Sequence, residues 1–207
     1  MTPADAVGLS EAGERRLVWG LQLLLCGLVI YGLATFRFGV AANAGAALAV
    51  TALPAMLRRE YGYTMDAGLV VLITVAVFLH VVGALGPYRW LSWYDEVTHT
   101  VSSVLIAGVG YAVLSAFERH SSAVEIPAAF RGVFVVVFVL AAGVVWELLE
   151  FAVASVARGV GVGSPLVVYG IDDIVTDMLF NTVGAVVTVL WGTEHFDSLV
   201  PFVRRWL

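Results

Sequence analysis

Residues 133–156 read VFVVVFVLAAGVVWELLEFAVASV, an apolar run in which only Glu147 and Glu150 are charged. As a helix, a run of this length extends about 36 Å, because each residue adds about 1.5 Å. The hydrocarbon core of a bilayer is about 30 Å thick, so this segment is long enough to cross it. We therefore predict a membrane-spanning helix that carries two carboxylates into the bilayer.

The composition of the whole chain is that of a membrane protein. Of its 207 residues, 60% are hydrophobic and only 13% are charged, whereas ordinary globular domains contain about 25% charged residues. A soluble core cannot bury this much apolar surface, so we exclude a soluble enzyme and a nucleic-acid-binding protein. The single cysteine, Cys26, excludes an intramolecular disulfide framework and a cysteine-rich zinc site.

Five further apolar runs approach the length that a membrane-spanning helix needs. The sequence thus predicts an all-α fold, a polytopic bundle of about six transmembrane helices. This helical domain would occupy residues 17–191, between an N-terminal tail at 1–16 and a C-terminal tail at 192–207. The six predicted spans are residues 17–36, 39–57, 67–86, 95–117, 133–156 and 173–191.

The arginines indicate how this bundle lies in the membrane. All eleven basic residues are arginines; with six spans, eight of them fall on the side of the two termini and three on the other side. Because cytoplasmic loops carry an excess of Arg and Lys, we expect both termini in the cytoplasm of a cell whose plasma membrane holds the protein. Acidic residues precede Arg15 and Arg16, which is the wrong charge order for a cleaved signal peptide.

Spans three to six carry ionisable side chains, and all of these lie toward the outer end of their helix. By the rise of a helix, the deeper ones lie roughly 5–13 Å below the outer boundary. Helical spacing also places the polar residues of each span on one stripe, as a bundle needs to line a shared interior site. These residues are His80, Asp95, Glu96, His99, Glu147, Glu150, Asp172, Asp173, Asp177 and Asn181.

The charge of this cluster requires compensation. It holds seven carboxylates with only Arg89 and Arg158 nearby, so the formal net charge of −5 belongs entirely to it. An acidic residue at the middle of a membrane helix costs about 2.5–3.5 kcal/mol on insertion scales. A bound cation or shared protons would offset this cost. Two imidazoles with several carboxylates suit Zn²⁺, Mn²⁺ or Fe²⁺, whereas carboxylates alone suit Mg²⁺ or Ca²⁺.

We therefore predict a divalent metal site. Glu150 is predicted as a general base or as a group that supports the ligands from behind, and Asn181 as the residue that orients a ligand. Glu96 and Asp172, near helix N-termini, are expected to cap backbone donors or to face solvent. A bound ion could activate water or polarise an oxygen of a lipid-linked or small-molecule substrate that arrives from the outer face. The predicted ligands are His80, Asp95, His99, Glu147, Asp173 and Asp177.

Four short stretches resemble the YjdF family of bacterial and archaeal inner-membrane proteins. His80-x-x-Gly83, with Tyr88 after it, is similar to the family's His-x-x-Gly element. The other three elements resembled are aromatic-Asp-x-x-x-His at Trp93-Tyr94-Asp95-Glu96-Val97-Thr98-His99, Glu-x-x-Glu-aromatic at Glu147-Leu148-Leu149-Glu150-Phe151, and Asp-x-x-x-Asp-Met at Asp173-Ile174-Val175-Thr176-Asp177-Met178. The resemblance covers residues 78–185 with the order of motifs preserved, and it implies a membrane protein of no established activity.

The resemblance has two departures and a more distant counterpart. The histidine expected just after Gly83 is absent, with Leu85 and Gly86 in that region, and Phe151 stands where tryptophan is common. The Asp-x-x-x-His and Asp-x-x-x-Asn-x-x-Gly pieces are also similar to VanZ-type membrane proteins. The departures leave one ligand position of the resembled family without its residue in this chain.

Two other functions stay open beside a metal-dependent enzyme. The same carboxylates could serve a proton- or ion-coupled transporter as a relay. Against this, spans one to three do not mirror spans four to six in polar content, and the inner halves of spans four to six are apolar. The third function is a structural or sensory membrane subunit, in which the buried acids hold the bundle together.

Overall fold

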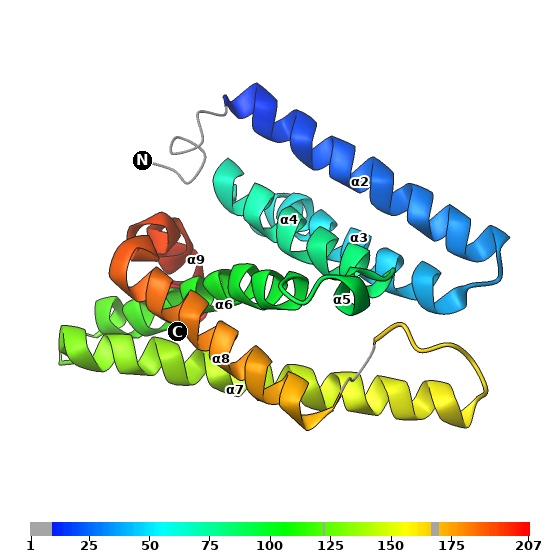
Figure 1. Cartoon of the computed structure of the whole chain (residues 1–207). Coiled ribbons are helices and arrows are strands. Elements are labelled where there is room, and N and C mark those ends of the chain that lie inside the picture. Colours follow the sequence, from blue (N-terminus) through cyan, green and yellow to red (C-terminus); the bar gives the residue numbers. More distant parts are fainter. Residues whose placement is uncertain (1–9, 122, 167–169) are drawn as a thin grey trace.

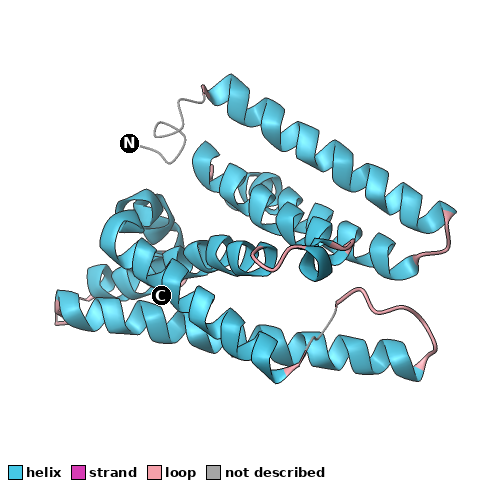
Figure 2. Cartoon of the chain, in the orientation of Figure 1, coloured by secondary structure: helices cyan, strands magenta, loops and turns pink. Residues whose placement is uncertain are grey.

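The computed structural model describes residues 10–121, 123–166 and 170–207. Within these ranges the chain is helical, without strands (Figures 1 and 2), and six helices are long and apolar enough to cross a membrane. The prediction of an all-α bundle with six membrane helices is therefore confirmed. The long helices are α2 (Glu11–Ala34), α3 (Phe38–Tyr61), α4 (Ala67–Ala84), α6 (Tyr94–His120), α7 (Ala128–Gly159) and α8 (Ile171–Val187). The short elements are α5 (Pro87–Trp90), the π-helix η1 (Thr188–Gly192), the 3₁₀-helix η2 (Thr193–Leu199) and α9 (Val200–Arg204).

Several helix ends follow local sequence signals. Side-chain caps begin two helices, Ser10 at α2 and Asp66 at α4. Gly62 ends α3 in the left-handed conformation, with φ of 66°, which a glycine adopts without strain. By contrast, α6 and α8 begin without a side-chain cap, although acidic residues occupy their first turns. Glu96 and Asp172 lie in these first turns, after the cap residues Trp93 and Gly170, where a carboxylate suits the helix dipole.

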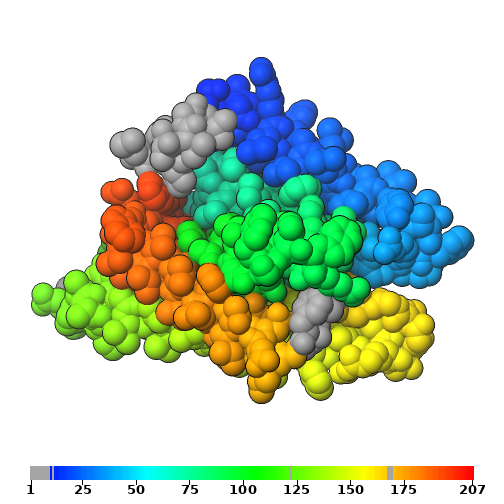
Figure 3. All heavy atoms as spheres, viewed as in Figure 1, coloured from blue at the N-terminus to red at the C-terminus, as the bar shows by residue number. Residues whose placement is uncertain are grey.

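The long helices form two groups of three. α2, α3 and α4 pack together, and α6, α7 and α8 form the second group. The contact between α4 and α6 joins the groups. In the space-filling view α6 and α8 lie directly against each other (Figure 3). The second group has the larger apolar core, with Tyr111, Val135 and Val139 buried in it.

The chain after α8 completes that core. The elements η1, η2 and α9 pack against α6, and Phe196, Leu199 and Val200 are buried there. The ring of Phe196 covers Gly108, where a Cβ atom would lie only 2.1 Å from it. The ring of Phe196 thus fills the space that Gly108 leaves on α6, and part of the segment predicted as a C-terminal tail, residues 192–207, packs against the second helix group.

A close contact between α6 and α8 fixes the position of the polar stripes. A Cβ atom at Gly184 would lie 2.0 Å from the Oγ of Ser103 and 2.5 Å from the backbone oxygen of Thr100. Small residues let membrane helices approach in this way. His99 lies one turn from Ser103 on α6, and Asp177 lies two turns from Gly184 on α8. The glycine contact therefore holds these two side chains at one level of the bundle.

We expect Gly184→Ala to destabilise the bundle, because its methyl group would collide with a backbone oxygen of α6. Overpacking of this kind costs typically about 1–3 kcal/mol, which would lower the midpoint of thermal unfolding in detergent. Gly45→Ala on α3 is the matched control, because a Cβ atom there meets nothing within 4 Å. Equal midpoints for the two variants would contradict the close contact between α6 and α8.

Candidate functional site

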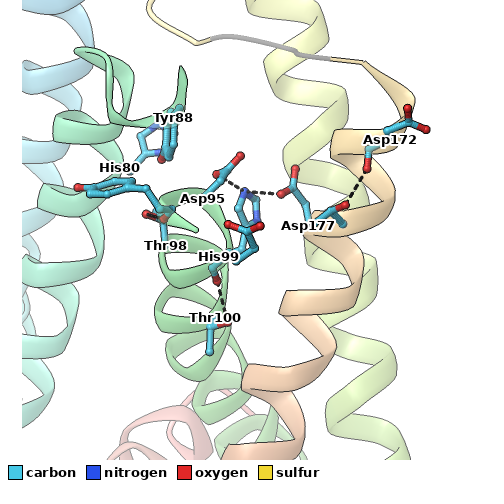
Figure 4. Close-up of polar contacts among 11 residues, drawn as sticks. His80, Tyr88, Asp95, Thr98, His99, Thr100, Asp172 and Asp177 are labelled. Carbon is cyan, nitrogen blue, oxygen red and sulfur yellow. Dashed lines mark hydrogen bonds and ion pairs between the residues drawn. The ribbon is translucent and has the colours of Figure 1, made fainter. Parts of the chain in front are cut away.

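Three of the predicted ligands meet between α6 and α8 (Figure 4). The Nε2 atom of His99 lies 3.4 Å from an Oδ1 of Asp95 and 3.3 Å from the Oδ1 of Asp177. One ligand atom from each residue lies within 4.8 Å of the other two. Asp95 and His99 share a face of α6 because they are four residues apart, and Asp177 faces them from α8. Only 4% of Asp177 is exposed, so this triad is inside the bundle.

Further carboxylates surround the triad. Asp173, one turn before Asp177, lies within hydrogen-bonding distance of Asp95. Glu147 and Glu150, from α7, interact electrostatically with Asp177. Glu147 is 9% exposed, and its Oε1 has no hydrogen-bond partner among the described residues. Buried polar atoms are nearly always hydrogen-bonded, so this oxygen marks a place where a ligand or water is needed.

Asn181 and Glu150, predicted to act beside the ligands, both interact with neighbouring side chains. Asn181 is 6% exposed and its side chain interacts with the imidazole of His99. A polar neighbour of this kind orients a histidine ligand, and that role of Asn181 stays a prediction. Glu150 interacts with the side chain of Trp146, four residues before it on α7.

His80 reaches this layer from α4 and is held by aromatic neighbours. Its Nδ1 lies 3.1 Å from the hydroxyl of Tyr88, and the ring of Trp146 packs against it edge-on with centroids 5.2 Å apart. A Cβ atom at Gly83 would lie 2.3 Å from the phenol ring of Tyr88. The spacing His80-x-x-Gly83 with Tyr88 thus has a steric cause, since the glycine leaves room for the ring that positions the histidine.

The hydrogen bond between the Tyr88 hydroxyl and Nδ1 of His80 forms in either tautomer of the imidazole, since the phenol and the ring nitrogen can each donate or accept. The hydroxyl of Thr98 donates to the backbone oxygen of Tyr94 at 2.9 Å and interacts with Tyr88. The other ring nitrogen of His80, Nε2, is buried and has no partner in the described part of the chain. Burial, reinforced by the charge of Asp95, raises the pKa of Tyr88, so the phenol stays protonated.

Asp172 and Glu96, the two acids expected to lie outside the site, differ in how far their side chains are buried. Asp172 is exposed and points away from the triad (Figure 4), as expected for a solvated group. Glu96 is half-buried, interacts electrostatically with Asp95 and His99, and has an Oε2 without a partner among the described residues. Glu96 is therefore not fully solvated, because one face of the first turn of α6 packs against the bundle.

The positive side chains lie elsewhere. In the described ranges, the ion pairs of arginine join Arg59 to Glu60, Arg119 to Asp197, and Arg131 to Glu118. None of these acids belongs to the cluster, and the chain has no lysine. The carboxylates around His99 therefore depend on protons or on a cation from outside the chain for charge compensation.

The fold and this cluster define a class: a polytopic helical membrane protein with acidic and histidine side chains gathered inside the bundle near one end. The chain belongs to the family DUF2238, described as "Predicted membrane protein", whose family model matches residues 16–198. The YjdF proteins are part of this family, which confirms that resemblance, while the similarity to VanZ-type proteins stays a prediction. Curated proteins and solved structures give no match.

Proposed function

We propose that the chain binds a divalent metal ion between Asp95, His99 and Asp177. The spacing of the ligand atoms carries this proposal. With metal–ligand bonds of about 2.0–2.2 Å, the edges of a tetrahedral site are about 3.3–3.6 Å long, and the two nitrogen–oxygen distances are 3.4 and 3.3 Å. Hydrogen bonding explains the arrangement less well, because Nε2 carries at most one proton and cannot direct it at both carboxylates.

The donor set favours a transition-metal ion or zinc. One imidazole with two carboxylates suits Zn²⁺, Mn²⁺ or Fe²⁺ better than Mg²⁺, which is usually bound through oxygen. Three protein ligands leave a position for water, as in catalytic zinc sites. The unpartnered Nε2 of His80 and Oε1 of Glu147 are available as further ligands or as hydrogen-bond partners of that water.

We propose further that this site hydrolyses an ester or phosphoester bond of a membrane-embedded lipid. A bound divalent ion supplies a Lewis acid and a nucleophilic water at neutral pH. Glu150, which lies beside Trp146, would accept the proton of the attacking water as a general base. Asn181 keeps His99 in its ligating orientation. Because the triad is buried inside a membrane bundle, a substrate whose reactive bond lies in the bilayer suits it best.

A proton- or ion-coupled transporter using the same carboxylates is supported less well. A transporter needs a polar path to both sides of the membrane. Between the triad and the opposite end of the second helix group, Ala107 and Val139 are buried and apolar, and the buried hydroxyls of Ser103 and Thr188 donate to backbone oxygens of their own helical segments. A purely structural role accounts poorly for the unpartnered atoms of His80 and Glu147, since groups that hold a bundle together are paired.

We expect the wild-type protein to bind one divalent ion per chain and Asp177→Asn to bind none. At a metal concentration a hundred times the dissociation constant, binding stabilises the fold by about 2.7 kcal/mol. This stabilisation should weaken as the pH falls, because the ligands must be deprotonated. Metal content and thermal unfolding in detergent measure both effects.

Asp172→Asn is the matched control for that experiment. It removes the same charge from the same helix but at an exposed position outside the triad, so metal binding should be retained. If Asp177→Asn instead stabilises the protein with or without metal, protons compensate the cluster and the proton-relay function moves ahead of the metal site.

We expect the metal-loaded protein in nanodiscs of total membrane lipid to cleave one class of lipid, detected by mass spectrometry. Glu150→Gln should slow cleavage by about 10²–10⁴-fold, the usual contribution of a general base, while it keeps the metal. Asp177→Asn should lose both metal and activity. Stoichiometric metal binding without cleavage of any lipid would refute the hydrolase and leave the metal site standing.

We also propose that the cluster faces the outside of the plasma membrane and that both termini are cytoplasmic, on the basis of the arginine distribution. In a Cys26→Ala background, an impermeant maleimide added to intact cells should label Val162→Cys and spare Val124→Cys. Both valines are exposed, so access to the side chain does not limit labelling. The reverse pattern would place the cluster on the cytoplasmic side.

A further inference from the structure

A cavity of about 390 Å³ lies between α2, α3 and α4 at the other end of the bundle from the acidic cluster. Its lining includes Trp19 and Gln22 of α2, Pro54 and Arg58 of α3, and Val70 of α4. Pockets of this volume accept small ligands or part of a larger one. None of these residues belongs to the proposed metal site, so the cavity is a separate candidate binding site.

The lining changes from charged to apolar with depth. Arg15 lies near the start of α2 and Arg58 in the last turn of α3, so both are at the mouth. Val18, Trp19 and Pro54 follow further along the same two helices, toward the middle of the bilayer. A phospholipid in one leaflet has the same order, with a charged head group at the surface and acyl chains below it. The order of charged and apolar residues in the cavity therefore suits an amphiphilic ligand that lies parallel to the surrounding lipids.

The floor of the cavity is closed by a hydrogen bond between helices. The side-chain amide of Gln22 donates to the Oγ1 of Thr51 at 3.1 Å and lies 3.4 Å from its backbone oxygen. Thr51 is 4% exposed. Pro54, one turn further along α3, has no N–H to donate to the preceding turn. This polar contact closes the cavity toward the interior of the bundle, and the acidic cluster lies beyond it.

The charges at the mouth favour a phosphate group. Arg15 and Arg58 are exposed, and neither has an ion pair or side-chain hydrogen bond within the described ranges, whereas the neighbouring Arg59 pairs with Glu60. Guanidinium groups bind phosphate through paired hydrogen bonds. Glu14 also lines the cavity but is buried at 5% exposure and has an interaction of its own.

We propose that this cavity binds one anionic phospholipid from the adjoining leaflet. Its phosphate lies between Arg15 and Arg58, and one acyl chain follows Val18 and Trp19 toward Gln22. A tryptophan at this depth is typical of the membrane interface, where an amphipathic ring contacts both head groups and chains. The cavity would then select an anionic lipid at this one position, whereas basic residues in general attract anionic lipids without a fixed position.

The test uses the full chain in detergent and native mass spectrometry. We expect one molecule of dioctanoyl phosphatidylglycerol to bind at least tenfold more tightly than dioctanoyl phosphatidylcholine. The pair Arg15→Gln and Arg58→Gln should remove this preference. The matched control pair is Arg16→Gln and Arg59→Gln, which removes the same charge one residue away on each helix but outside the cavity, and its affinity should stay within twofold of wild type.

A second variant tests the apolar part of the cavity without a change of charge. Ala55→Phe adds a ring to the lining and should reduce phosphatidylglycerol binding at least tenfold, while its thermal unfolding midpoint reports whether the fold is intact. Four outcomes would overturn the proposal: equal binding of both lipids, equal loss in the two arginine pairs, unchanged binding in the cavity pair, or displacement of the lipid by millimolar inorganic phosphate, which would indicate a site for free anions.

Discussion

The burial of several carboxylates inside a membrane bundle is the constraint on which the rest of this structure depends. Asp95, Asp173, Asp177, Glu147 and Glu150 interact electrostatically with one another without an arginine partner among the described residues. One divalent ion compensates two of these five charges. The others must then share protons, and interacting acids give up such protons as a set. Metal binding and proton binding are thus two parts of one charge balance, because a bound cation favours the charged form of each acid near it.

The helices contribute unequally to this balance. The second helix group supplies the five acids, and the close contact at Gly184 keeps α8 near enough to α6 for Asp177 to meet His99. The first group supplies His80, whose ring is fixed by Tyr88 and Trp146 rather than by an acid. The site therefore lies across the contact between the two groups, and its shape depends on how α4 sits against α6 and α7.

Much of the site could be predicted from the sequence because membrane helices cross the bilayer in a regular way. The depth of a residue below the membrane surface follows from its number along the helix. The sequence alone could therefore place His99 and Asp177 at one depth, although it could not show that their helices are neighbours. Their common stripe follows from the 3.6-residue period.

The residues that sequence reasoning missed depend on tertiary contacts. Tyr88 lies on a four-residue helix whose direction no periodicity reveals, and the sequence assigned Trp146 only to packing or the membrane boundary, whereas its ring contacts His80. Glu96 was expected to cap a helix or to face solvent, but one face of that helix end packs against the bundle and half-buries its side chain. The segment 192–207 has no apolar run long enough to span the membrane, so the burial of Phe196 against Gly108 could not be predicted from hydropathy.

The helix α4 connects the two ends of the molecule. Val70 of α4 lines the cavity between the first three helices, and His80 extends from the same helix into the layer of the acidic cluster. These residues are separated by ten positions, or about 15 Å of one helix. The interior between them is packed, with Ile73, Thr74 and Ala76 buried, and the hydroxyl of Thr74 donates to the backbone oxygen of Val70, so no polar path joins the two regions through these residues. A ligand in the cavity can therefore influence the cluster only by displacing α4 as a rigid element, and such a displacement would change the contact of His80 with Trp146.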